Sequence, residues 1–177
     1  MKKLGTHTDT SLPKIRLDQA ALLRKRVRQS CITVECVILY FTGLFFFTAS
    51  PLFTLYWFLA STGMVIVTYL YAVLKAPDGI TENNYESYLK WHVVVSCMTG
   101  SVWALFACLY LDPTSVISMF VATNLIVSIT LGGMLPSAEY RPSFLGLATC
   151  MLIPFAIFWI ATVAGPLRLV GAGVLVF

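Results

Sequence analysis

The sequence predicts an all-α, multi-pass protein of an inner membrane, with its N-terminus in the cytoplasm. Three observations support this prediction. The chain of 177 residues is 58% hydrophobic, only 11% of its residues are charged, and its apolar residues gather in long uninterrupted runs. Soluble domains are usually about 45–50% apolar and about 25% charged. A lipid bilayer is therefore the expected solvent for most of the chain.

The N-terminal segment, residues 1–29, is predicted to form a cytoplasmic amphipathic helix. Residues 1–10 are polar, and a helix start is expected at Ser11, with Pro13 in the first turn. From there to Gln29, apolar residues recur at helical spacing and basic residues occupy the other positions. This helix can lie on the cytoplasmic leaflet or lead straight into the first span, and a solvated run of charges is the alternative. The apolar positions are Leu12, Ile15, Leu22, Leu23 and Val27.

Residues 30–177 form the predicted transmembrane domain. About 20 residues of helix cross the hydrocarbon core of a bilayer, and five complete apolar runs of that kind follow one another. Short turns and one longer polar loop, residues 75–90, separate them. The predicted spans cover residues 31–49, 52–74, 91–111, 114–135 and 143–164.

A sixth apolar run begins near Leu167 and stops at Phe177. A helix of ten residues covers about 15 Å, which is half of the hydrocarbon core. We therefore expect the sequence to be a fragment that ends inside its sixth helix. A five-span protein with a half-inserted tail is the alternative.

The basic residues determine the predicted orientation. Eight of the twelve Lys and Arg residues precede residue 30. With a cytoplasmic N-terminus, Lys75, Lys90 and Arg141 are also cytoplasmic, and only Arg168 lies outside. Cytoplasmic loops carry the excess of Lys and Arg in membrane proteins, so this topology is strongly preferred over its inverse. The same clustering argues against nucleic acid as a partner.

The chain lacks the residues that metal or soluble enzyme chemistry requires. Its five cysteines lie in apolar runs, are odd in number and form no C-x-x-C motif, so free thiols are expected. With only two histidines, we expect no metal, haem or other cofactor. The sequence has no phosphate-binding loop and no H-E-x-x-H or G-x-S-x-G motif. No catalytic residues are predicted in this fragment.

Small residues recur every fourth position along the third predicted span. Because lipid gives little hydrophobic drive between helices, close approach through small residues is a main source of packing. We expect the stripe to pack against another helix of the same chain, with a dimer seam as the alternative. Its members are Ser96, Gly100, Ala104 and Cys108.

Two polar residues inside spans are candidate signal-sensing residues. Glu35 lies in the first span, where a carboxylate must pair, protonate or face a cavity; its expected partners are His92, Lys90 and Arg28. Asn124 lies near the middle of the fourth span and needs a hydrogen bond or a polar pocket. Each residue has a structural role as the alternative. Glu35 would then be a carboxylate that snorkels to the interface or forms a fixed ion pair, and Asn124 an amide that holds helices together.

The predicted outer turns consist of only a few residues each, so no external ligand-binding domain can be built from them. A signal must therefore enter between the helices or arrive through the lipid. This favours a small amphiphilic or apolar ligand.

The order of several short motifs resembles the N-terminal, membrane-embedded, six-helix (MASE-like) sensory modules of bacterial diguanylate cyclases, cyclic-di-GMP phosphodiesterases and hybrid histidine kinases. These modules often have a tyrosine in the basic lead-in helix. This chain lacks it and has the basic residues 24–26 at that place. The matching features are the lead-in over residues 15–29, Trp91, Gly100-x-x-Trp103, Asp112-Pro113, Gly132-Gly133, Tyr140-x-Pro142-x-Phe144 and Pro154.

The resemblance implies a sensory input domain of a bacterial signalling protein, in cyclic-di-GMP or two-component signalling. It also implies a homodimer formed through the sixth helix, which leads to a cytoplasmic output domain, either a diguanylate cyclase or a histidine kinase. A small transporter or channel and a membrane scaffold are the alternative functions. The candidate sensing residues are Glu35, His92, Trp103, Asn124 and Tyr140.

Overall fold

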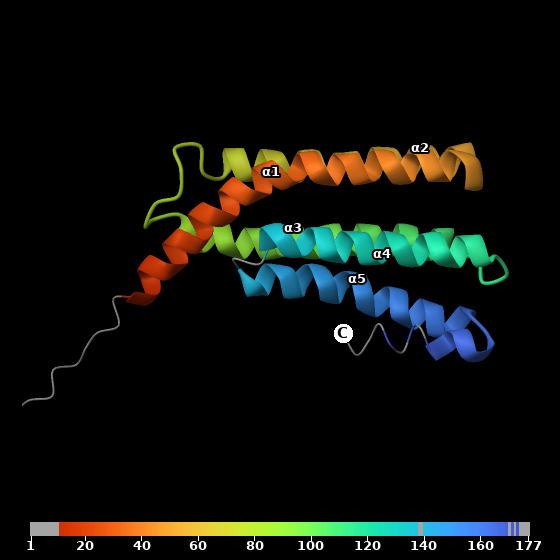
Figure 1. Cartoon of the computed structure of the whole chain (residues 1–177). Coiled ribbons are helices and arrows are strands. Elements are labelled where there is room, and N and C mark those ends of the chain that lie inside the picture. Colours follow the sequence, from red (N-terminus) through yellow and green to blue (C-terminus); the bar gives the residue numbers. More distant parts are fainter. Residues whose placement is uncertain (1–10, 138–139, 170, 172, 174–177) are drawn as a thin grey trace, which may run out of the picture.

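The computed structural model describes residues 11–137, 140–169, 171 and 173, and these form an all-helical bundle (Figure 1). The described part contains no strand. Its elements are α1 Ser11–Thr48, α2 Pro51–Leu74, α3 Tyr85–Tyr110, α4 Val116–Ser137, α5 Arg141–Thr162 and the 3₁₀ turn η1 Gly165–Leu167.

The five helices run roughly along a common direction, joined by short connections at the two ends of the bundle (Figure 1). The hairpin of α1 and α2 forms one part, α3 and α5 pack closely side by side, and α4 contacts α1, α3 and α5. The N-terminal part of α1 crosses obliquely past the start of α3 (Figure 1). The expected all-α architecture is confirmed.

Four helices, α1, α2, α3 and α5, are long and apolar enough to cross a membrane, and α4 contributes a shorter described apolar stretch, Val116–Gly132. Large apolar side chains point outward from the bundle, and Phe47 is 85% exposed. Such a surface is unfavourable in water and suits lipid, because large contiguous apolar patches are rare on soluble monomers. A multi-pass membrane protein is the class that this fold defines.

The predicted N-terminal helix is the beginning of α1 and not a separate element, so the boundary placed between residues 29 and 30 falls inside one continuous helix. Leu23 and Val27 are buried, in a cluster that also contains Tyr88 and Leu89. Arg24 Nε donates a hydrogen bond of 3.1 Å to the carbonyl of Ala72. These contacts attach the basic lead-in to α2 and α3.

Only one side of this lead-in is covered. Ile15 and Leu22, both predicted for its apolar face, are 50% and 46% exposed. The side chain of Leu12 lies outside the described residues.

The loop predicted for residues 75–90 is shorter in the structure, because α3 begins at Tyr85. Asn84 precedes the helix, and its amide accepts a hydrogen bond from Thr81 N at 2.8 Å and donates one to Gly79 O at 3.1 Å. Tyr88 and Leu89 in the first turns are buried. The early start therefore results from burial of two apolar side chains in a segment with several charged and polar neighbours.

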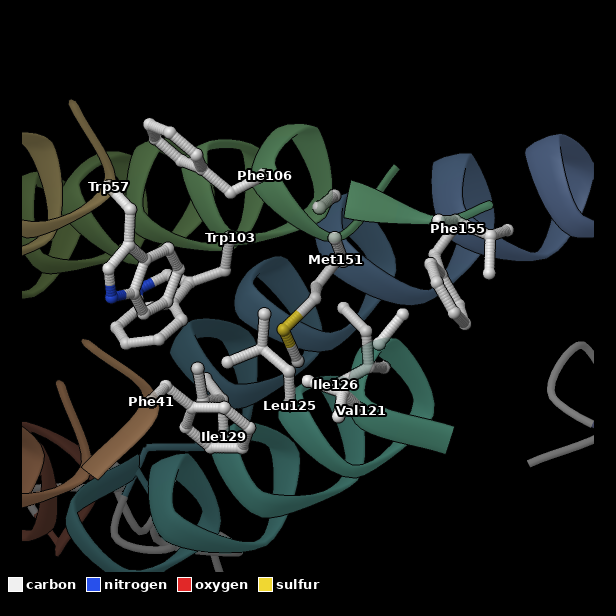
Figure 2. Close-up of a cluster of buried hydrophobic side chains, with 14 of the residues drawn as sticks. Phe41, Trp57, Trp103, Phe106, Val121, Leu125, Ile126, Ile129, Met151 and Phe155 are labelled. Atoms are coloured by element: carbon white, nitrogen blue, oxygen red, sulfur yellow. The ribbon is translucent and has the colours of Figure 1, made fainter. Parts of the chain in front are cut away.

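The core is an aromatic-rich cluster contributed by all five helices, part of which is shown in Figure 2. Trp57 and Trp103 lie edge to face, with ring centroids 4.9 Å apart. Trp57 Nε1 donates a hydrogen bond of 3.1 Å to Thr42 Oγ1, which satisfies the buried indole N–H.

The turn between α3 and α4 gives a prediction on acid titration. Asp112 Oδ1 accepts hydrogen bonds from Thr114 N at 2.9 Å and Thr114 Oγ1 at 2.7 Å. These bonds lower the pKa of Asp112 below its ordinary value of 3.8, since they favour the ionised form. The carboxylate therefore stabilises the turn above its unfolded-state pKa, and this contribution is lost as the pH falls through the lower folded-state pKa.

Carboxyl NMR titration of the protein in micelles measures this pKa directly. Thr114→Ala removes one hydrogen bond and should raise the pKa of Asp112. Thr162→Ala, which removes a hydroxyl bonded only to its own helix at Phe158 O, should leave it unchanged. An Asp112 pKa at or above 3.8 in the unmodified protein would contradict the prediction.

Candidate functional site

A cavity of about 510 Å³ lies among the five helices. Its walls come from α1 and α2 on one side and from α3, α4 and α5 on the other. Apolar side chains predominate, interrupted by several hydroxyls, the imidazole of His92, the amide of Gln29 and the guanidinium of Arg26. The lining residues are Arg26, Val27, Gln29, Ser30, Cys31, Thr33, Val34, Val37, Met64, Val65, Thr68, His92, Val95, Ser96, Thr99, Trp103, Ser128, Ile129, Gly132 and Leu147.

Three hydroxyls of the lining have their protons engaged within their own helices. Ser30, Thr68 and Thr99 donate to the carbonyls of Val27, Met64 and Val95, at 3.0, 2.8 and 2.8 Å. A hydroxyl oxygen that donates in this way keeps lone pairs that can accept a hydrogen bond. The cavity therefore offers neutral acceptors on three helices, which suits a ligand that carries hydroxyl or other donor groups on an apolar body.

His92 is the most buried polar group of this lining, at 4% exposure. Its Nδ1 lies 2.8 Å from Ser143 Oγ, on α5, and 3.3 Å from Ser96 Oγ, one turn along α3. No hydrogen bond of Nε2 is recorded in the described part of the chain. The imidazole thus connects α3 to α5 through Nδ1 and keeps a second polar atom for another partner.

Ser143 is a functional candidate that sequence reasoning missed. It is fully buried on α5 and contacts His92 across the helix interface. A single serine near the start of an apolar span carries no signal by itself, since most such hydroxyls bond to their own helix. Only the distance to His92 in the folded chain identifies it.

An aromatic pair lies next to His92. The rings of Tyr71 and Tyr88 stack with centroids 5.2 Å apart, and the Tyr71 hydroxyl donates a hydrogen bond to the carbonyl of Tyr88. The ring of His92 is 6.4 Å from that of Tyr88 and 6.5 Å from that of Tyr71. This pair connects the end of α2 to the beginning of α3, beside the cavity.

Trp103 forms a different part of the cavity wall, about three turns along α3 from His92. It is 1% exposed and packs against Trp57. Of the five predicted sensing residues, His92 and Trp103 line the cavity.

Glu35 does not line the cavity, and its expected partners His92, Lys90 and Arg28 are not the ones the structure provides. Its Oε1 accepts a hydrogen bond of 2.9 Å from Thr62 Oγ1 on α2, while its buried Oε2 has no partner in the described residues. The prediction of its partners was wrong because hydropathy indicates how deep a residue lies in the bilayer but not the rotation of its helix, which decides the neighbouring residues that it contacts.

Asn124 and Tyr140 also lie outside the cavity lining. Asn124 is exposed on the outer surface of α4, and its Nδ2 donates to Phe120 O of the same helix at 2.9 Å. Tyr140 precedes α5, is half-buried and packs against the cluster around Leu23 and Tyr88.

The stripe of small residues on α3 lies close to α5. A Cβ atom built on Gly100 would be 2.4 Å from the carbonyl oxygen of Leu147. Ala104 is 2% exposed, and Cys108 packs against the main core cluster. Ser96, at one end of the stripe, belongs to both the helix contact and the cavity lining. The close contact of α3 and α5 therefore positions His92 and Ser143.

The bundle and its cavity define a multi-pass helical membrane protein with a partly polar cavity between its helices. Comparison with protein-family models, with curated proteins and with solved structures finds no match to this chain.

Proposed function

We propose that this chain is the sensory input domain of a bacterial signalling protein and that the cavity binds a small amphiphilic molecule. The supporting observation is a cavity of about 510 Å³ with mostly apolar walls from all five helices, several hydroxyls and the guanidinium of Arg26. Small-molecule sites usually have volumes of about 300–1,000 Å³, apolar walls and a few polar groups that orient the ligand. An amphiphile that partitions into the bilayer would reach such a site.

Signal transmission would depend on the position of the cavity between two parts of the bundle. The α1–α2 hairpin forms one wall, and α3, α4 and α5 form the other. A molecule that fits better at one separation of these parts shifts the population toward that separation. The sixth helix proposed to follow α5 would carry the change to a cytoplasmic output domain, either a diguanylate cyclase or a histidine kinase.

We further propose that the protein lies in the inner membrane with its N-terminus in the cytoplasm, with five spans and the start of a sixth. The basic start of α1, Lys75 after α2 and Arg141 at the start of α5 belong to the same end of the bundle (Figure 1). This end would face the cytoplasm under the positive-inside rule.

The binding proposal can be tested by photo-crosslinking in lipid vesicles with a diazirine-bearing decanol. Labelled peptides should map to cavity-lining residues, and unlabelled decanol should compete. Ser128→Leu adds bulk to the lining and should reduce this labelling roughly tenfold. Ser101→Leu is the matched control, since Ser101 is exposed on α3 and does not line the cavity. Labelling confined to lipid-facing residues, or equal in both variants, would refute binding in the cavity.

The signalling role has its own test. The reading frame beyond Phe177 should encode a helical linker and a cyclase or kinase domain, and Ser128→Leu in that whole protein should change its output. A frame that encodes a second set of spans and no output domain would contradict the sensory function without affecting the cavity.

A further inference from the structure

The outer surface of α4 carries a regular row of exposed residues with one amide among large apolar side chains. Successive spacings in this row are three, four, three and four residues. That is the a/d pattern of a helix that packs against another helix. The row consists of Ile117, Phe120, Asn124, Val127 and Leu131, and its four apolar members are 47–69% exposed.

The opposite face of α4 is already occupied by the core of the bundle. Ala122, Leu125 and Ile126 are at most 1% exposed. The row is therefore a surface distinct from the one that holds α4 in the bundle.

Asn124 indicates what this surface contacts. Its Nδ2 donates one hydrogen bond to Phe120 O, and no partner is recorded for the second N–H or for Oδ1 within the described residues. The residue lies near the middle of α4, Val116–Ser137. Hydrocarbon offers no hydrogen-bond partner at that depth, so an amide there favours association with another helix.

We propose that α4 is a homodimer interface in which Asn124 of one chain hydrogen-bonds to Asn124 of a second copy. A carboxamide carries both a donor and an acceptor, so two identical amides are complementary to each other. A two-fold axis along the membrane normal brings each a/d position opposite itself. With such an axis, a second copy places its own Asn124 amide at the same depth in the bilayer. Asparagine at a single a position sets register and dimeric state in other paired helices.

This interface differs from the sixth-helix dimer implied by the family resemblance, and it does not depend on a ligand in the cavity. The helix α4 would then contribute to both the dimer interface and the cavity, since its residues Ser128, Ile129 and Gly132 line the cavity.

The test measures dimerisation by energy transfer between donor- and acceptor-labelled chains in lipid vesicles, over a series of protein-to-lipid ratios. The 177-residue chain should dimerise. Asn124→Leu, which removes the amide at similar size, should raise the dissociation constant on the order of 3- to 20-fold. Asn124→Gln keeps the amide and should retain most of the affinity.

Thr123→Val is the matched control, because Thr123 is the next residue and its hydroxyl bonds only to Met119 O of its own helix. It should leave dimerisation unchanged. Replacing the native cysteines with alanine and introducing Asn124→Cys should give disulfide-linked dimers, whereas Thr123→Cys should not. A monomer at all ratios, or a dimer unaffected by both Asn124→Leu and Phe120→Ala, would overturn the proposal.

Discussion

Gly100→Ala is expected to destabilise the protein by about 2–3 kcal/mol, a typical cost of overpacking a tight interior contact. The added Cβ would stand 2.4 Å from the carbonyl oxygen of Leu147 and 3.3 Å from its carbonyl carbon. Both are backbone atoms, so no side chain can rotate out of the way. The helices α3 and α5 would have to separate or shift along each other.

Gly63→Ala is the matched control, since the Cβ it would introduce in α2 has no heavy atom of another described element within 4 Å. Alanine is the better helix former, and this variant should be neutral or more stable by up to about 1 kcal/mol. Equilibrium unfolding in mixed micelles, by titration with sodium dodecyl sulfate, measures both values. Equal stability of the two variants would contradict the close packing of α3 on α5.

Separation of α3 and α5 would also change the candidate site. His92 on α3 reaches Ser143 on α5 at 2.8 Å, and Ser96 lies one turn before Gly100. We therefore expect Gly100→Ala to weaken the His92–Ser143 contact, which histidine side-chain NMR can monitor. The glycine would then influence the cavity through the spacing of the helices and not by direct contact.

The positions of the long helices could be predicted from the sequence, because crossing a bilayer requires a long apolar run and the turns between runs contain polar residues, Gly and Pro. The start of α3 at Tyr85 could not, because the segment to Lys90 contains charged residues at exposed positions. What stabilises that first part of the helix is burial of Tyr88 and Leu89, which depends on where α1 and α2 lie.

The contents of the site were only partly predictable for a related reason. A residue's depth follows from its place in a span, so His92 could be recognised as a polar group near one end of α3. The rotation of each helix about its axis does not follow from the sequence of that helix alone. Hence Glu35 faces Thr62 and not His92, and Ser143 gave no signal. Gly100 was recognisable because close contact itself requires a small residue.

Trp57→Ala is expected to lower the free energy of unfolding by about 3 kcal/mol, which is at the lower end of the range for truncating a buried aromatic side chain to alanine. Trp57 is fully buried and contacts Trp103 and Phe106 edge to face, at centroid distances of 4.9 and 5.5 Å. The lower end applies because unfolding within a micelle or bilayer transfers the indole to an apolar medium, so the loss is mainly one of packing contacts.

Trp91→Ala separates this packing effect from a general effect of removing tryptophan. Trp91 is 50% exposed, and its recorded ring contact is with Lys75 Nζ, 5.6 Å from the ring centroid. Its removal should cost less than about 1 kcal/mol, as expected for an exposed cation–π pair. Trp57→Phe keeps a ring but leaves Thr42 Oγ1 without its indole donor, so it should fall between the two. If Trp57→Ala proved no more destabilising than Trp91→Ala, the aromatic cluster would not be the part of the core that holds the α1–α2 hairpin against α3.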